Sequence, residues 1–165
     1  MKKNYVPLLV TMILVTSCQM KSKPVAFDPV TSKTEVTNTL DSLESALKSK
    51  DIKTFLSFYS EDGLYCGTDP SELWDKAGYT QVMTKMLADT TKFGDMKFNK
   101  TEIRFDKGGN SVNVLRQFET SWSKPVQVRS VMHLVKADKR WLVDFSNFAL
   151  IPENKDLAKI ALVVK

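Results

Sequence analysis

Residues 126–150 read VQVRSVMHLVKADKRWLVDFSNFAL, and this stretch decides the fold. It contains two runs with alternating apolar residues, 126–135 and 140–150, on either side of a polar turn around Asp138. A period of two is typical of β-strands, and a short connection joins antiparallel neighbours. The stretch therefore predicts a long hairpin near the C-terminal end of the chain.

The preceding residues extend this hairpin into a larger sheet. Residues 111–122 form another alternating run, and residues 96–105 form a fourth. In the fourth run, Met96 and Phe98 share one parity while Ile103 and Phe105 share the other, which predicts a β-bulge. Four strands with short connections predict an antiparallel meander.

Helices are predicted before the meander. Val36, Leu40, Leu43 and Leu47 recur at helical spacing, with Glu44 among the polar residues outside this stripe. A second short helix over residues 52–59 is expected to end at Gly63, before a strand over 64–66, and a third is expected to start at 69–72, with Asp69 as its N-cap. The order predicts an α+β fold, with three N-terminal helices packed on a strongly bent antiparallel sheet.

The first 34 residues are typical of an export signal and a tether. Lys2 and Lys3 precede the apolar run 6–15, and residues 14–18 read LVTSC, which resembles a bacterial lipobox. Residues 1–17 are thus interpreted as a lipoprotein signal peptide, and residues 18–34 as a lipidated Cys18 followed by a flexible tether. The alternative is an ordinary secretory signal in which Cys18 is incidental. The expected partner is a lipid bilayer, and the expected location is the bacterial cell envelope, facing the periplasm.

Charge and cysteine content exclude several classes of function. The net charge is +5, but residues 1–34 hold five lysines and one acidic residue, so residues 35–165 hold 19 basic and 18 acidic residues. Nucleic-acid binding requires a patch of one sign, so no nucleic-acid partner is expected. Cys66 has no nearby histidine or second cysteine and is interpreted as a structural thiol. With no phosphate loop and no metal-ligand spacing, we expect no metal and no cofactor.

Three passages resemble the SnoaL-like members of the NTF2-like superfamily. They are residues 58–63 (FYSEDG), 67–74 (GTDPSELW) and 139–145 (KRWLVDF). The resemblance implies an NTF2-like cone over residues 35–152, in which a curved sheet encloses a pocket, followed by a tail with a short helix over 153–165. Relatives include polyketide cyclases, steroid isomerases, dehydratases and oligomerisation domains, and many pair as homodimers through the outer sheet face. Many also carry histidines where this chain has Phe145 and Asn147.

A cross-strand pair provides candidate catalytic residues. A symmetric turn between the last two strands places His133 opposite Asp144, and Val131 opposite Ser146. Asp144 or His133 could then act as a general acid or base, with Arg116 or Arg129 binding an anionic group. A two-residue loop before the hairpin would place Arg116 on the same face, and a three-residue loop would turn it away. The alternative is a structural ion pair on the outer face or at a dimer contact.

Aromatic side chains are candidates for the pocket itself. Tyr59, Tyr65 and Trp74 combine an apolar ring with a polar tip, which suits the rim and floor of a ligand pocket. The first hypothesis is a membrane-anchored envelope protein that binds a small, partly apolar molecule in its cone. The alternatives are an isomerase, dehydratase or cyclase that uses Asp144 and His133, and a protein-interaction or dimerisation module.

Overall fold

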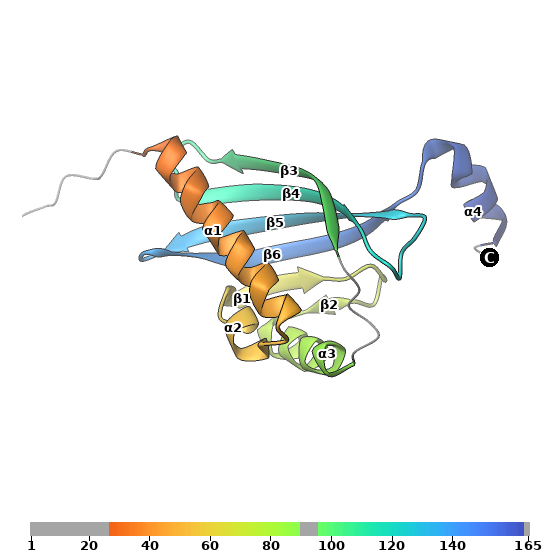
Figure 1. Ribbon diagram of the computed structural model, residues 1–165, viewed down its shortest axis with the longest axis horizontal. Helices are drawn as coiled ribbons and strands as arrows, with labels where there is room; N and C mark the ends of the chain where they lie inside the picture. Colours follow the sequence, from red (N-terminus) through yellow and green to blue (C-terminus); the bar gives the residue numbers. More distant parts are fainter. Residues whose placement is uncertain (1–26, 90–95, 164–165) are drawn as a thin grey trace, which may run out of the picture.

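Three helices lie on one face of a six-stranded sheet: α1 (Pro29–Lys48), α2 (Ile52–Leu56) and α3 (Lys76–Ala88). Figure 1 shows α1 crossing the sheet obliquely, with α2 and α3 gathered at one edge. The computed structural model describes residues 27–89 and 96–163. The expected α+β architecture, with helices on one face of a sheet, is confirmed.

Helix α1 begins earlier than the sequence pattern predicts. The Asp28 side chain accepts hydrogen bonds from the backbone N–H groups of Val30 (3.1 Å) and Thr31 (3.4 Å), which makes Asp28 the N-cap. Residues 29–34 are therefore helical, and the prediction that the tether extends to residue 34 is wrong at that end. The signal peptide, Cys18 and the rest of the expected tether up to residue 26 lie outside the described residues.

The sheet is mixed, with strand order β2-β1-β6-β5-β4-β3. The strands are β1 (Tyr59–Cys66), β2 (Leu73–Trp74), β3 (Lys97–Phe105), β4 (Ser111–Glu119), β5 (Gln127–Ala137) and β6 (Arg140–Ile151). The antiparallel meander β3–β6 is confirmed. Strand β1, however, pairs with β6 in parallel, and the long connection that this pairing requires consists of β2, α3 and the strands β3–β5.

The segment between α2 and α3 differs from the sequence expectation. Tyr59 begins β1 instead of ending a helix. Asp69 caps only a turn, in which its side chain accepts from the Ser71 backbone N–H at 2.8 Å. The N-cap of α3 is Asp75, which accepts from the Gly78 backbone N–H at 2.8 Å, so the predicted start at 69–72 is wrong. The short strand β2 lies between the predicted and the observed start of α3.

Two irregularities shape the long strands. The predicted bulge in β3 is confirmed by a register shift between Phe98 and Lys100. A second shift lies between β5 and β6: Leu134 pairs with Val143, but His133 pairs with Phe145. Asp144 is thus the extra residue of a bulge that the sequence pattern does not reveal. Bulges increase the local bend of a strand.

The core lies between α1 and the inner face of the sheet. Val36 and Leu40 of α1 are buried, as are Val112, Leu134 and Trp141 of the sheet. The tail beyond β6 forms η1 (Asn154–Asp156) and α4 (Leu157–Val163), which lie away from α1–α3 in Figure 1. Within the described ranges, no helix is long and apolar enough to cross a bilayer.

Candidate functional site

A cavity of about 400 Å³ lies between the helices and the inner face of the sheet. Its lining comes from α1, α2 and α3 on one side and from all six strands on the other. Most lining residues are apolar, among them Leu43, Leu47, Met83, Met86 and Met132. Cavities that bind small molecules have volumes of this order and linings of this kind. Methionine side chains also adapt readily to the shape of a ligand.

The side-chain sizes along the sheet explain where the cavity lies. At one end, Leu134, Trp141 and Val143 are buried and fill the space beneath α1. Further along β5, alternation places Met132 and then Ser130 on the same inner face. The short serine side chain leaves space that the larger residues close at the other end. The inward-facing residues of β5 therefore contribute to the position of the cavity.

An ion pair lies in this apolar lining. The Arg116 guanidinium on β4 contacts the Glu44 carboxylate on α1, and both residues line the cavity. Their side chains are 10% and 16% exposed, respectively. The guanidinium also lies over the Phe98 ring, with Cζ 3.4 Å from the ring centroid, and Arg116 Nε has no hydrogen-bond partner among the described residues. The cavity thus contains a fixed pair of opposite charges.

Tyrosine rings form the wall near β1. Tyr59 and Tyr79 line the cavity and are buried, with the Tyr79 hydroxyl donating to the Tyr59 hydroxyl at 3.3 Å. Burial raises the pKa of both phenols above the usual range. These hydroxyls therefore stay protonated near neutral pH, and they act as hydrogen-bonding groups.

Tyr65 has a structural role in the same cluster. Its hydroxyl donates to the backbone carbonyls of Ser60 (2.7 Å) and Val143 (3.2 Å), which ties β1 to β6. Its ring packs against Tyr59 and Tyr79, with centroids 5.1 and 4.7 Å away. Tyr65 is not among the cavity-lining residues, whereas Tyr59 and Trp74 are. Two of the three aromatic candidates thus reach the cavity.

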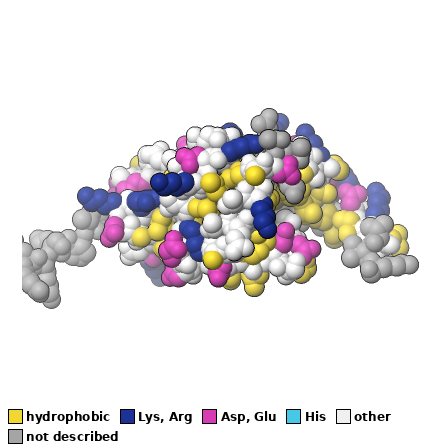
Figure 2. Space-filling view, turned by 90° about the horizontal axis from the view of Figure 1, so that it is seen from below, with side chains coloured by type: hydrophobic (Ala, Val, Ile, Leu, Met, Phe, Trp, Pro, Cys, Tyr) yellow, Lys and Arg dark blue, Asp and Glu magenta, His cyan; other side chains and the backbone are white. Residues whose placement is uncertain are grey.

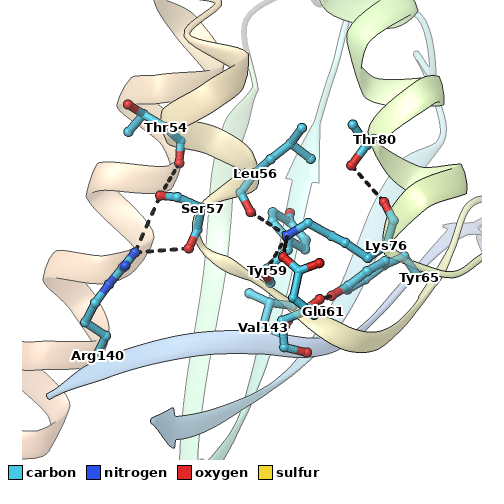
Figure 3. Close-up of polar contacts among 11 residues, drawn as sticks. Thr54, Leu56, Ser57, Tyr59, Glu61, Tyr65, Lys76, Thr80, Arg140 and Val143 are labelled. Carbon is cyan, nitrogen blue, oxygen red and sulfur yellow. Dashed lines mark hydrogen bonds and ion pairs between the residues drawn. The ribbon is translucent and has the colours of Figure 1, made fainter. Parts of the chain in front are cut away.

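Polar contacts behind this wall hold β1 in place (Figure 3). Lys76 at the start of α3 donates to the carbonyls of Leu56 (2.6 Å) and Tyr59 (2.5 Å) and lies 3.8 Å from the Glu61 carboxylate. Arg140 on β6 donates to the Ser57 carbonyl at 3.0 Å. Desolvation lowers the Lys76 pKa. These contacts join α2, α3 and β6 around Tyr59, and so they fix the tyrosine wall.

The cavity reaches the surface beside partly exposed apolar groups. Trp122, in the connection between β4 and β5, lines the cavity and is 52% exposed. Figure 2, seen from below, shows hydrophobic side chains with positive and negative groups interspersed around them. No field of a single sign dominates this view. The surface in this view thus gives no strong electrostatic preference for a ligand, and the distinguishing features are the apolar lining of the cavity and its internal ion pair.

The two candidate catalytic residues lie together, but not at the cavity. His133 Nδ1 is 2.6 Å from Asp144 Oδ1, and the two side chains are about 30% exposed. Inward positions of β5 carry Met132 and Leu134, so His133 between them faces the opposite side of the sheet. Neither His133 nor Asp144 lines the cavity. Their catalytic role stays a hypothesis.

The bulge at Asp144 corrects the register argument. Val135 pairs with Leu142 as expected, but beyond the bulge Val131 pairs with Asn147 and not with Ser146. Arg116 pairs with Ser130 on the inner face. A two-residue loop would have put Arg116 on the face of His133, but residues 120–126 connect β4 to β5, and Arg116 lies on the opposite face from His133.

The remaining predicted site residue faces away from the cavity. Arg129 is exposed on the outer face, where its Nη2 donates to the Gln117 side-chain oxygen at 3.4 Å. Arg116 and Arg129 therefore lie on opposite faces, and only Arg116 could bind a molecule in the cavity. In the described part of the chain, no group of three or more His, Cys, Asp or Glu residues could hold a metal ion.

Glu44 is the site residue that sequence analysis missed. The sequence pattern puts Glu44 outside the apolar stripe of α1, but it lies one turn after Leu40 and one turn before Leu47. This position borders the apolar stripe, so the side chain can reach inward. An acidic residue next to the stripe, together with Arg116 between Val114 and Phe118, was the available signal.

Comparisons with known proteins agree with this architecture. A family model described as a SnoaL-like domain matches residues 36–144, more than half of the chain. No curated protein matches the sequence significantly.

Several solved structures have the same fold. A domain of unknown function with a cystatin-like fold from Nostoc punctiforme has a TM-score of 0.67 at 11% identity, over 81% of this chain and 86% of that one. A protein of unknown function from Pectobacterium atrosepticum gives 0.63 at 17% identity, with coverages of 74% and 92%. An NTF2-like protein from Cytophaga hutchinsonii gives 0.58 at 14%, with coverages of 72% and 98%. At these identities the similarity shows the fold alone.

Proposed function

The chain belongs to the SnoaL-like family, with an NTF2-like fold, and from this premise we propose that it binds a small, partly apolar molecule in its cavity. The observation that carries the proposal is the cavity of about 400 Å³ with an apolar lining and one internal ion pair. Family membership alone does not assign a function, because one fold hosts many activities. The proposal therefore depends on the lining of this chain's own cavity.

Two neighbouring residues on β5 provide a direct test. Ser130 lines the cavity, whereas Val131 lies on the opposite face. The full chain is purified from the cells that make it, and native mass spectrometry with organic extraction identifies any retained molecule. Ser130→Leu reduces cavity volume and is expected to weaken binding at least about tenfold, which corresponds to roughly 1.4 kcal/mol. Val131→Leu is the matched control and is expected to leave binding unchanged.

Two outcomes would contradict this proposal. One is the absence both of a retained molecule and of a thermal shift across a panel of apolar metabolites. The other is equal binding by the Ser130→Leu and wild-type chains, with both shown to be folded by circular dichroism. The second outcome would place any bound molecule outside the cavity.

The location is part of the same proposal. Lipid on Cys18 holds the domain at a bacterial membrane, facing the periplasm. Support comes from the charged start at Lys2 and Lys3, the apolar run 6–15 and the lipobox-like residues 14–18. A domain held at a membrane surface lies close to a source of apolar molecules, which fits the lining of the cavity.

A second candidate is pairing of two copies through the outer sheet face. Leu115, Val131, Val135, Leu142 and Phe145 are half-buried on this face. The helices α1–α3 cover the opposite face. A dimer would bury these apolar side chains, and sedimentation analysis of the full chain would reveal it.

The acid–base alternative has less support. An isomerase, dehydratase or cyclase that uses Asp144 and His133 would need its substrate beside that pair. The cavity lies on the other side of the sheet. A cross-strand ion pair on the outer face accounts for the observed 2.6 Å contact without any reaction.

A further inference from the structure

The charged groups of the cavity limit which ligands it can hold. Of the described residues that line it, only Glu44, Glu72 and Arg116 carry a charge, so this part of the lining has a net charge of −1. The Glu72 carboxylate is engaged by the backbone, where it accepts from the N–H groups of Thr68 (2.7 Å) and Asp69 (3.0 Å). Among these charged groups, the pair of Glu44 and Arg116 is therefore the one left for a ligand.

Arg116 has hydrogen-bonding capacity that the described residues do not use. A guanidinium carries five N–H donors. In the described residues, the Arg116 guanidinium contacts one carboxylate, that of Glu44, and its Nε is buried without a partner. The Phe98 ring covers one face of the group and holds its plane. Because Arg116 lines the cavity, a ligand atom that accepts a hydrogen bond would bind to an Nη group of the guanidinium, whereas the enclosed Nε lies out of its reach.

A charged end group on the ligand is disfavoured, whether its charge is negative or positive. An anionic end would bring a second negative charge beside Glu44, or would displace Glu44 and leave that carboxylate without its partner. A cationic end would lie beside the Arg116 guanidinium. Charges without a partner are costly in apolar surroundings, whereas a neutral group adds no net charge.

We propose that the cavity selects an uncharged, largely apolar molecule with one polar end group, a hydroxyl or an amide, that accepts from Arg116 and donates to Glu44. This inference rests on the proposed function, because it names the class of ligand for the same cavity. The apolar body of the ligand lies against the methionine and phenylalanine side chains of the lining.

Three matched ligands test the inference on the full chain. Decan-1-ol, decanoate and decylamine share one apolar tail and differ in their end groups. Binding is followed at pH 8 by calorimetry and by the fluorescence of Trp74 and Trp122, which line the cavity. Decan-1-ol is expected to bind the wild-type chain at least about tenfold more tightly than decanoate or decylamine.

Two variants separate the role of charge from that of shape. Glu44→Gln keeps the shape of the side chain but removes its charge, so decanoate is expected to bind about tenfold more tightly than to the wild type. The double variant Glu44→Leu/Arg116→Leu replaces the pair by apolar groups and is expected to lose the preference for the alcohol. The double variant is also expected to fold, because removing both charges leaves no unpaired charge in the apolar lining.

Each contrary result would overturn the inference. Decanoate or decylamine binding the wild-type chain as tightly as decan-1-ol would do so, as would a Glu44→Gln variant with unchanged affinity for decanoate. If none of the three ligands binds, the inference is also wrong. The retained-molecule experiment then decides separately whether the proposed function is wrong with it.

Discussion

The most consequential single residue is Arg116, because its charge is buried beside one partner. Arg116→Leu is expected to lower the free energy of unfolding by about 2–3 kcal/mol, since the Glu44 carboxylate would remain in the apolar lining without a counter-charge. This is below the range for fully enclosed pairs, because the cavity can admit water. Urea unfolding measures the change.

Two variants control this experiment. Arg129 is exposed on the outer face, so Arg129→Leu is expected to change the same free energy by less than about 0.5 kcal/mol. The double variant Glu44→Leu/Arg116→Leu is expected to recover most of the loss, because no unpaired charge remains. Equal stability of the Arg116→Leu and wild-type chains would show that the ion pair contributes nothing.

Contacts between single residues were predictable from the sequence where they depend on a short turn. The turn around Asp138 is short, so His133 was correctly expected near Asp144, although a bulge separates their formal pairing. The face of Arg116 was not predictable, because it depended on the length of the β4–β5 connection. The inward orientation of Glu44 was missed because its position borders the stripe, and packing against β4 decides which way it turns.

At the scale of elements, periodicity predicted the long helix and the long strands correctly, and it failed between α2 and α3. There, the short segments β1 and β2 are stabilised by pairing with β6 and with each other, not by their own pattern. Local capping signals were also ambiguous. Asp69 and Asp75 both make capping hydrogen bonds, but only Asp75 precedes a helix.

The contact between β1 and α3 leads to a prediction about alkaline stability. Burial raises the pKa of Tyr59 and Tyr79 above the usual 10.0, so the folded chain keeps protons that the unfolded chain loses. Stability is therefore expected to fall as the pH rises above 10.0. At about pH 11, each tyrosine accounts for roughly 1.4 kcal/mol of the loss.

The double variant Tyr59→Phe/Tyr79→Phe isolates this effect. Its free energy of unfolding is measured in urea at about pH 8 and pH 11, beside that of the wild type. The variant is expected to lose less stability over this interval. Desolvation lowers the pKa of Lys76, but Lys76 is present in both chains, so its contribution cancels in the comparison. An equal loss in both chains would show that the tyrosines do not carry the pH dependence.

For the whole molecule, the meander was predictable because short connections determine which strands are neighbours. The parallel pairing of β1 with β6 was not, since it joins residues as distant along the chain as Tyr65 and Ser146. The existence of a cavity followed only from the family resemblance. Its lining required the structure, because it combines single residues from elements throughout the described chain.

The proposed attachment of the whole molecule to a membrane rests on one cysteine of two. If Cys18 carries lipid, a clickable fatty-acid label added to the producing bacteria is expected to mark the protein and to follow it into the membrane fraction. Each buried CH₂ contributes about 0.8 kcal/mol, so several acyl chains hold the protein firmly. Cys18→Ser is expected to abolish the label and to release the protein from that fraction.

Cys66→Ser is the matched control, because Cys66 lines the cavity within the folded domain and is not part of the lipobox-like stretch. It is expected to keep both the label and the membrane location. Label that persists in Cys18→Ser, or that disappears in Cys66→Ser alone, would contradict the anchor. A labelled wild-type chain that stays out of the membrane fraction would show that acylation does not attach the protein to a membrane. In that case the proximity of the cavity to a membrane would no longer support an apolar ligand.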